Sequence, residues 1–213
     1  MVKTALVIWD WNGTLLDDTR QCYEIENAMR TRRGMPPFSG MEEYRWLFRF
    51  PVIEFYKDMG YTFETESYEA ISEEFVRLYT EIVYDCPLQP GSRETLETLR
   101  SRGIPQALLS ATSQARLEQQ VWRFGLDHYF EAVLGQKDDL AHGKAERGRR
   151  YLESSGVDPA QVLFVGDTDH DYAVASAMGC RVALLSAGHQ PRAVLERCGV
   201  PVIDSLAELP ALV

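Results

Sequence analysis

The chain has 213 residues, 45% of them hydrophobic and 25% charged, a composition that is globular and excludes a disordered or fibrous protein. Its net charge of −10 argues against nucleic acid as the main partner, because phosphate groups would repel it. The longest stretch without Asp, Glu, Lys or Arg, residues 103–115, is too short to span a membrane, and residues 1–9 are too short for a secretory signal. We therefore expect a cytoplasmic protein with no membrane association, long enough for one ordinary domain and a sizeable insertion.

An apolar run over residues 5–9 predicts a buried strand, and the run ends abruptly on Asp10. Gly13 permits a tight turn immediately afterwards, and Thr14 adds a hydroxyl close to the carboxylate. Because open α/β sheets bind ligands at the carboxyl ends of their strands, an acid in this place is a candidate covalent nucleophile. The alternative is that Asp10 only caps a following helix.

Residues 17–87 show helical periodicity and no strand pattern. Asp17, Asp18 and Thr19 are predicted to cap the first helix with their side chains. The expected helices lie before residue 34, from residue 41, over about 51–60 and over 64–83. A purely helical segment directly after the first strand predicts a second, smaller domain. We expect this helical cap, 17–87, to be inserted into a core domain made of residues 1–16 and 88–213.

From residue 90 onward, strands and helices alternate. The predicted strands cover 105–110, 130–134, 161–166, 181–185 and 200–203. The predicted helices cover 92–102, 113–124 and 142–155, then a segment ending at 178, then 190–198. This alternation predicts an α/β fold with a doubly wound, Rossmann-like parallel sheet.

Polar side chains stand at the ends of several of these strands. Asp10 follows the first strand, Ser110 ends the second, and Asp167 follows a later one with Asp171 four residues further on. Since the carboxyl ends of parallel strands share one edge of the sheet, we expect these groups to converge. Carboxylates that meet there would repel one another without a cation, and Mg²⁺ suits such a set best. Lys144, near the start of its helix, is placed to offset the charge of a phosphate or of the nucleophile.

Four motifs occur in order: Asp10-Trp11-Asn12-Gly13-Thr14, Leu108-Leu109-Ser110, Lys144, and Gly166-Asp167-Thr168-Asp169-His170-Asp171. On these motifs the chain resembles the haloacid dehalogenase superfamily, in the phosphoglycolate-phosphatase-like branch that carries a helical cap after the first strand. The first and fourth motifs are specific, and the resemblance covers essentially the whole length. It implies a Mg²⁺-dependent phosphohydrolase that acts on a small phosphorylated metabolite, as a monomer or homodimer.

The resemblance also implies catalytic roles for individual residues. Asp10 would attack phosphorus and form an aspartyl-phosphate that water then cleaves. Ser110 and the neighbouring Ala111 would bind the phosphoryl group, and Lys144 would hold both the nucleophile and the phosphate. Thr14 would orient the loop.

For the metal, the resemblance implies Asp10, Asp167 and the main-chain carbonyl of Asn12 as Mg²⁺ ligands, with Asp171 as a further acidic contact. Asn12 is also where the chain departs from the pattern. Phosphatases of the superfamily usually carry an Asp there, which protonates the leaving group and later activates water. An amide does neither, and losing a general acid/base typically lowers the rate about 10²–10⁴-fold.

Asn12 leaves three hypotheses open. The chain hydrolyses esters with good leaving groups, or it uses another acid such as His170 or a cap residue, or it has drifted toward phosphate binding and slow switching. Dehalogenation and phosphonate hydrolysis are alternatives within the same superfamily.

Arg45 and Arg49 lie four residues apart among aromatic residues, on one face of a predicted cap helix. Our hypothesis is that this face closes over the core and grips an anionic part of the substrate. The alternative is that these arginines only solvate the helix surface. Trp9 is expected in the core, whereas Trp11 either walls the active-site mouth or packs under the cap.

Overall fold

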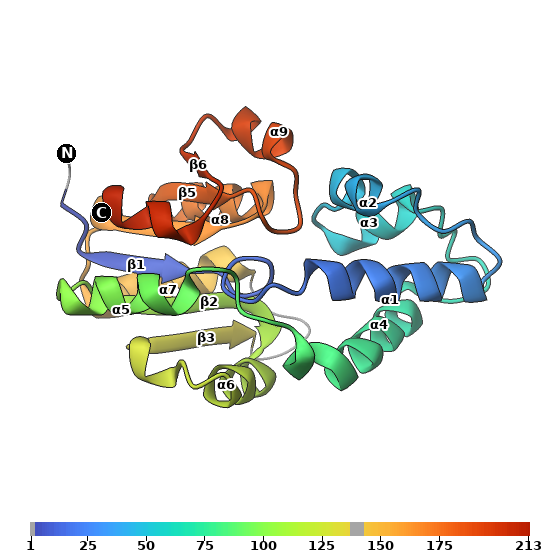
Figure 1. Ribbon diagram of the computed structural model, residues 1–213, viewed down its shortest axis with the longest axis horizontal. Coiled ribbons are helices and arrows are strands. Elements are labelled where there is room, and N and C mark those ends of the chain that lie inside the picture. The colour runs from blue at the N-terminus through green and yellow to red at the C-terminus, as the bar shows by residue number, and fades with distance from the viewer. Residues whose placement is uncertain (1–2, 137–142) are drawn as a thin grey trace.

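The computed structural model describes residues 3–136 and 143–213 and contains one six-stranded sheet in the order β3-β2-β1-β4-β5-β6 (Figure 1). The strands are β1 (Leu6–Trp9), β2 (Gln106–Ser113), β3 (Ala132–Gln136), β4 (Val162–Gly166), β5 (Arg181–Leu185) and β6 (Val202–Ile203). All neighbouring strands pair in parallel, so the predicted α/β fold with a doubly wound sheet is confirmed.

Helices cover both faces of the sheet because the side chains of β1 alternate between two hydrophobic clusters. Val7 and Trp9 pack into one cluster, and Leu6 and Ile8 pack into the other. The first cluster is covered by α5 (Ser92–Ser101) and α6 (Gln114–Arg123), and the second by α7 (Lys144–Ser155), α8 (Asp169–Met178) and α9 (Arg192–Leu195). The helix predicted over 142–155 begins at a residue that lies outside the described ranges. Short 3₁₀ helices occupy Val83–Asp85, Asp127–Tyr129, Pro159–Gln161, Glu196–Cys198 and Leu206–Ala211.

Residues 17–87, here called the helical insert, lie beyond the carboxyl ends of the strands (Figure 1). The insert contains α1 (Thr19–Arg32), α2 (Met41–Leu47), α3 (Val52–Asp58) and α4 (Tyr68–Ile82), and no strand, as the sequence predicted. It has a hydrophobic cluster of its own, which includes Met29, Tyr44 and Ile71. Its two connections to the sheet run side by side, because the Asp17 backbone N–H donates to the Pro87 carbonyl at 2.9 Å. The division into a core domain and an inserted cap domain stays a prediction.

Helix α2 contacts the segment that follows β5. The guanidinium of Arg45 donates to the backbone carbonyls of Ser186 and Gln190, the latter at 2.7 Å. The next residue, Trp46, is 44% exposed, and the Arg197 guanidinium lies 5.8 Å from the centre of its ring. Among the helices of residues 3–136 and 143–213, none combines the length and apolar character needed to cross a bilayer.

Candidate active site

The loop after β1 brings Asp10 against Asp167 at the end of β4. Gly13 has a φ of +73°, and a Cβ on it would lie 2.2 Å from Asp167 Oδ2, so the turn requires glycine on both counts. The Thr14 hydroxyl donates to Asp167 Oδ1 at 3.0 Å and lies 3.4 Å from Asp10 Oδ2. The Thr14 hydroxyl therefore lies between the two carboxylates, which fits the loop-orienting role expected for it.

Lys144, the first residue of α7, joins Asp10 to Asp171. Its ammonium donates to Asp10 Oδ1 and, at 2.7 Å, to Asp171 Oδ1. The other oxygen of Asp171 accepts from the Thr168 hydroxyl at 2.7 Å and from the Thr168 backbone N–H at 3.1 Å. The Asp171 backbone N–H in turn donates to the Thr168 hydroxyl at 3.2 Å, which completes a capping box at the start of α8. The helix terminus itself therefore fixes the Asp171 carboxylate.

Burial dominates the electrostatics of this cluster. It raises the pKa of Asp10 to about 8, and the nearby carboxylates of Asp171 and Asp167 add to the rise while Lys144 opposes it. Burial likewise raises the pKa of Asp167 to about 6. For Asp171, burial is outweighed by the Lys144 ammonium and by hydrogen bonds from Lys144 and Thr168, which hold its pKa below the usual range.

The carboxylates fit a divalent cation. Asp10, Asp167 and Asp171 are all buried, and oxygens from the three lie within 4.8 Å of one another. A set of buried oxygen ligands with excess negative charge is what Mg²⁺ binds, and such a cation would also offset the repulsion that raises the Asp10 pKa. Mg²⁺ binding here, including the expected contact to the Asn12 carbonyl, stays a prediction.

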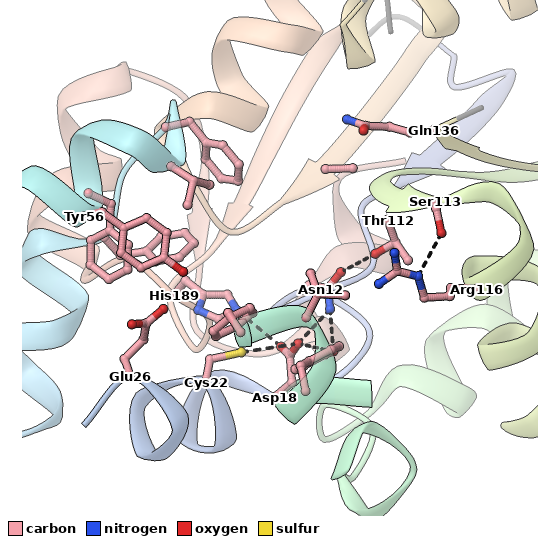
Figure 2. Close-up of a pocket in the computed structure, with 18 of the residues that line it drawn as sticks. Asn12, Asp18, Cys22, Glu26, Tyr56, Thr112, Ser113, Arg116, Gln136 and His189 are labelled. Carbon is pink, nitrogen blue, oxygen red and sulfur yellow. Dashed lines mark hydrogen bonds and ion pairs between the residues drawn. The ribbon is translucent and has the colours of Figure 1, made fainter. Parts of the chain in front are cut away.

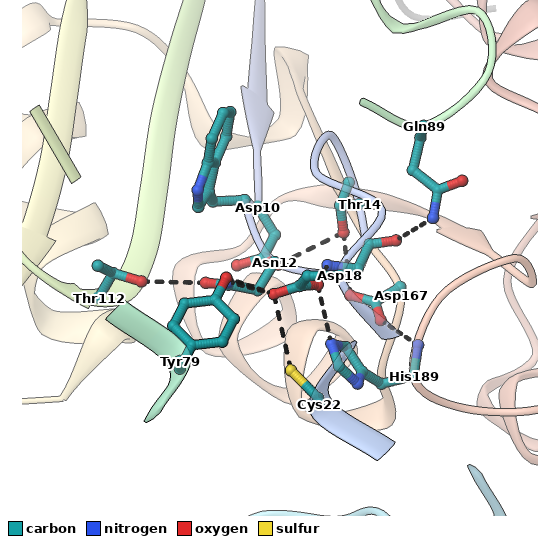
Figure 3. Close-up of polar contacts among 12 residues, drawn as sticks. Asp10, Asn12, Thr14, Asp18, Cys22, Tyr79, Gln89, Thr112, Asp167 and His189 are labelled. Atoms are coloured by element: carbon teal, nitrogen blue, oxygen red, sulfur yellow. Dashed lines mark hydrogen bonds and ion pairs between the residues drawn. The ribbon is translucent and has the colours of Figure 1, made fainter. Parts of the chain in front are cut away.

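The side chain of Asn12 is held in a network centred on Asp18 (Figure 3). Its amide nitrogen donates to Asp18 Oδ2 and to the Tyr79 hydroxyl, both at 2.7 Å, and its oxygen accepts from the Thr112 hydroxyl at 3.0 Å. Asp18 also accepts from the Gly13 backbone N–H at 2.9 Å and from the Tyr79 hydroxyl at 2.6 Å. All hydrogen-bonding atoms of the Asn12 side chain are therefore used within the protein.

The prediction that Asp18 caps α1 with its side chain is wrong. Asp18 is the residue before the helix, but its carboxylate accepts no capping hydrogen bond from a backbone N–H of the first turn. Its contact with α1 is to the Cys22 thiol at 3.9 Å. It is fully buried and turns to Gly13, and it lies 3.3 Å from His189 Nε2. Burial acts against its charge, yet the hydrogen bond and charge of His189 and the bonds from Tyr79 and Asn12 keep its pKa below the usual range.

A pocket of about 70 Å³ opens onto the carboxylates. It is lined by Asp10, Asn12, Ser110, Ala111, Lys144, Asp167, Thr168, His170, Asp171 and His189, with Phe48 and Phe50 from the insert. The structure thus brings together the residues predicted to bind phosphate and metal from four separate elements. His170 is in reach of the pocket, where burial lowers its pKa and its ring stacks on Phe50 at 4.5 Å.

Three residues singled out in the sequence lie elsewhere. Arg45 bonds to the segment after β5, and Arg49 pairs with Asp58 at 2.7 Å, so neither lines this pocket and their substrate-binding role stays a prediction. Trp11 does not line this pocket, and its hydrophobic cluster includes Val83 and Cys86 of the insert, which fits the alternative that it packs under the insert. It is fully buried in the sheet core, where its indole N–H donates to Gln120 Oε1 at 2.8 Å.

Sequence reasoning missed His189 and the two insert phenylalanines. The His189 backbone N–H donates to Asp167 Oδ2 at 2.6 Å, and its Nδ1 lies 3.0 Å from the Tyr44 hydroxyl. His189 follows β5, so the strand-end rule that found Asp10 and Asp167 was an available signal. Phe48 and Phe50 gave no such signal, because their place depends on how the insert sits over the sheet.

Comparison with known proteins places similar sequences and folds among hydrolases and phosphatases. Residues 7–185 match the model of the family described as haloacid dehalogenase-like hydrolase. Phosphoglycolate phosphatase 1 of Pseudomonas aeruginosa is 27% identical, over 96% of this chain and 78% of that protein. Among solved structures, a haloacid dehalogenase-like family hydrolase of Streptococcus pneumoniae is 20% identical with a TM-score of 0.77, over 100% of this chain and 99% of that one.

Another structure of the same fold is protein tyrosine kinase A of Mycobacterium tuberculosis, 22% identical with a TM-score of 0.81 over 99% of this chain and 98% of that one. Likeness of fold alone therefore does not assign the reaction. The match over most of the length does assign the family. The chain belongs to the haloacid dehalogenase-like hydrolases, in the phosphoglycolate-phosphatase-like branch that its motifs predicted.

Proposed function

We propose that the chain is a Mg²⁺-dependent phosphatase that hydrolyses small phosphate monoesters through an aspartyl-phosphate on Asp10. The observation that carries the proposal is the convergence of a nucleophilic carboxylate, an ammonium and two further carboxylates in one small pocket. Membership of a hydrolase family and likeness to proteins named phosphoglycolate phosphatase support it.

Asp10 carries the covalent chemistry. One of its oxygens forms a bond to phosphorus as the ester P–O bond breaks, and water later cleaves the aspartyl-phosphate to phosphate and the free carboxylate. Lys144 holds the nucleophile and neutralises charge on the transferring group, while Ser110 and the backbone at Ala111 receive its oxygens. Asp171 keeps Lys144 in place through their 2.7 Å contact.

Asp10, Asp167 and Asp171 are the side chains that would hold Mg²⁺, which when bound supplies positive charge to the phosphoryl oxygens and to the nucleophile. The protein's own contribution is to fix the orientation of these carboxylates by hydrogen bonds. Thr14 and the His189 backbone N–H each fix one oxygen of Asp167.

Asn12 sets the limit of the reaction. Its amide has no exchangeable proton of useful pKa, so the leaving group must depart without help from this position. We expect slow turnover of esters of ordinary alcohols and faster turnover of esters whose leaving groups are weak bases.

The test is Mg²⁺-dependent phosphate release from an activated aryl phosphate and from a panel of sugar and short organic-acid phosphates. Three proteins are compared: the natural chain, Asp10→Asn and Asn12→Asp. The expected result is turnover by the natural chain, loss in Asp10→Asn, and a gain on unactivated esters in Asn12→Asp. Metal-independent turnover of a halogenated acid would instead identify a dehalogenase.

A second candidate function is a phosphate-binding or regulatory protein with weak catalysis. It is favoured by the three hydrogen bonds that commit the Asn12 side chain to Asp18, Tyr79 and Thr112. Stabilisation by a phosphate analogue such as vanadate, without turnover by any of the three proteins, would support it over the phosphatase.

A further inference from the structure

A chamber of about 330 Å³ adjoins the catalytic pocket and is almost five times its size. Helices α1–α4 of the insert form one side, and residues 111–113 with Arg116 form part of the other. Asn12, Ala111 and His189 line both spaces. The small pocket suits a phosphoryl group, and the chamber has the size of a site for a small organic molecule.

An aromatic wall runs from the catalytic pocket into the chamber. Ring centres are 5.7 Å apart between Phe50 and Phe48, 5.2 Å between Phe48 and Phe55, and 6.1 Å between Phe55 and Tyr56. At its start, Phe50 stacks on His170 in the catalytic pocket. Rings at these spacings offer edges and faces to another aromatic ring.

The far end of the chamber is acidic and incompletely bonded. Glu26 is 2% exposed, and its Oε2 has no hydrogen-bond partner among the described residues. Glu26 lies eight residues beyond Asp18 on α1, which corresponds to about 12 Å of helix. Burial raises the Glu26 pKa to about 8. A buried polar atom without a partner favours a ligand that supplies one. A carboxyl group that burial keeps uncharged offers no positive charge to an anion.

The chamber offers few cationic groups to a carboxylate, because His189, which lines it, already contacts Asp18 and Tyr44 through its two ring nitrogens. None of the six arginines in residues 17–50 of the insert lines it, namely Arg20, Arg30, Arg32, Arg33, Arg45 and Arg49. Arg116 is the one Lys or Arg among the described lining residues, and Figure 2 shows it at the opposite end from Glu26. Its Nε already donates to the Ser113 hydroxyl at 3.0 Å.

The chemistry of Asn12 also bears on which leaving group the site accepts. Without a proton donor at this position, a leaving group departs readily only when it is a weak base. Phenols ionise near pH 10, about six units below water and therefore far more readily than ordinary alcohols. Both the wall and the missing acid thus favour an aromatic leaving group.

We propose that the chamber holds the leaving group of the substrate and selects an uncharged aromatic alcohol, so that the substrate is an aryl phosphate monoester. This rests on the proposed function. As the Asp10 oxygen bonds to phosphorus, the aryl oxygen leaves with the electron pair of the broken P–O bond. The phenolate then takes a proton from water, and a second water cleaves the aspartyl-phosphate to release phosphate.

The experiment has a binding arm and a turnover arm. In the first, the dissociation constants of 2-naphthyl phosphate, benzyl phosphate and phosphoglycolate are measured by calorimetry on Asp10→Asn with Mg²⁺. Both aromatic esters are expected to bind at least tenfold more tightly than phosphoglycolate. In the second, the natural chain is expected to turn over 2-naphthyl phosphate at least 100-fold faster than benzyl phosphate, whose ring is similar but whose leaving group is an ordinary alcohol.

Val76, which lines the chamber, supplies the structural test, and Thr80, exposed on the same helix, supplies the matched control. Val76→Trp is expected to reduce the binding preference for 2-naphthyl phosphate at least tenfold, and Thr80→Trp to leave it unchanged. If phosphoglycolate binds more tightly than the two aromatic esters, and Arg116→Gln weakens that binding, the proposal is overturned. Aromatic preference in binding with no Asp10-dependent turnover would refute the phosphatase function while leaving the selectivity of the chamber standing.

Discussion

The contact between Asn12 and Asp18 makes the effect of Asn12→Asp on stability calculable. The substitution places a second carboxylate about 2.7 Å from Asp18 Oδ2 and removes the amide that bonded to it. Two unit charges at that distance repel by about 6 kcal/mol at an effective dielectric constant of 20. That is comparable to the whole stability of many domains, so the folded variant will instead hold one proton between the two carboxyls.

The shared proton makes the stability of the Asn12→Asp variant depend on pH. Above pH 5 the unfolded chain has both carboxyls ionised, so the folded variant binds one proton more than the unfolded one. Its free energy of unfolding, relative to the natural chain, is therefore expected to fall by about 1.4 kcal/mol per pH unit, or about 4 kcal/mol between pH 5 and pH 8. Urea denaturation at several pH values, without Mg²⁺, measures this slope.

Two companion variants isolate the cause. Asn12→Ala loses the same hydrogen bonds without adding a charge, so its penalty should not change with pH. The exchange Asn12→Asp with Asp18→Asn restores one amide and one carboxylate across the contact, and the slope should vanish. An Asn12→Asp variant that is equally destabilised at pH 5 and pH 8, or an exchange variant that keeps the slope, would refute the reasoning.

Other predictions follow from single contacts. Lys144→Met should lower kcat/KM for phosphate release at least about 100-fold, because it removes the positive charge beside the nucleophile; near-normal turnover would contradict that role. Glu26→Gln should gain stability relative to the natural chain as pH rises from 5 to 8, since the raised pKa of Glu26, about 8, makes its ionised form costly over that range. Urea denaturation at pH 5 and pH 8 measures this, and a stability difference that is equal at the two pH values would contradict it. Gly13→Ala should destabilise far more than Gly34→Ala in thermal melting. Both glycines have positive φ, but only at Gly13 does a Cβ meet another group; equal losses would mean that the φ alone decides.

Much of the fold could be predicted because the strands are short apolar runs with clear ends. Asp10 and Asp167 each follow such a run, and the rule that parallel strands end along one edge was enough to bring them together. The end of β2 was harder to predict. The sequence suggested that the strand ends at Ser110, but it continues to Ser113 after an irregularity in its pairing between Leu109 and Ser113.

The remainder of the site depends on contacts between residues far apart in the chain. By residue type, Asp18 is a good helix cap, but Tyr79 and His189 offer it stronger partners from 61 and 171 positions away. The backbone carbonyls that Arg45 contacts could not be foreseen either, because the distance between α2 and the β5 segment is set by packing that no local pattern records. The same holds for the unpartnered oxygen of Glu26.

Trp46 gives this protein an optical reporter of how the insert sits on the sheet. Trp9 and Trp11 are sealed in the core and Trp122 lies 68% exposed on α6, so Trp46 is the indole that spans the junction between α2 and the C-terminal part of the chain. The neighbouring Arg45 donates to the Gln190 carbonyl in the same C-terminal part of the chain. Any movement that parts the two surfaces changes the charge and the water around that indole. A chain in which Trp122 is replaced by Phe would therefore report the movement in its fluorescence, with no attached dye.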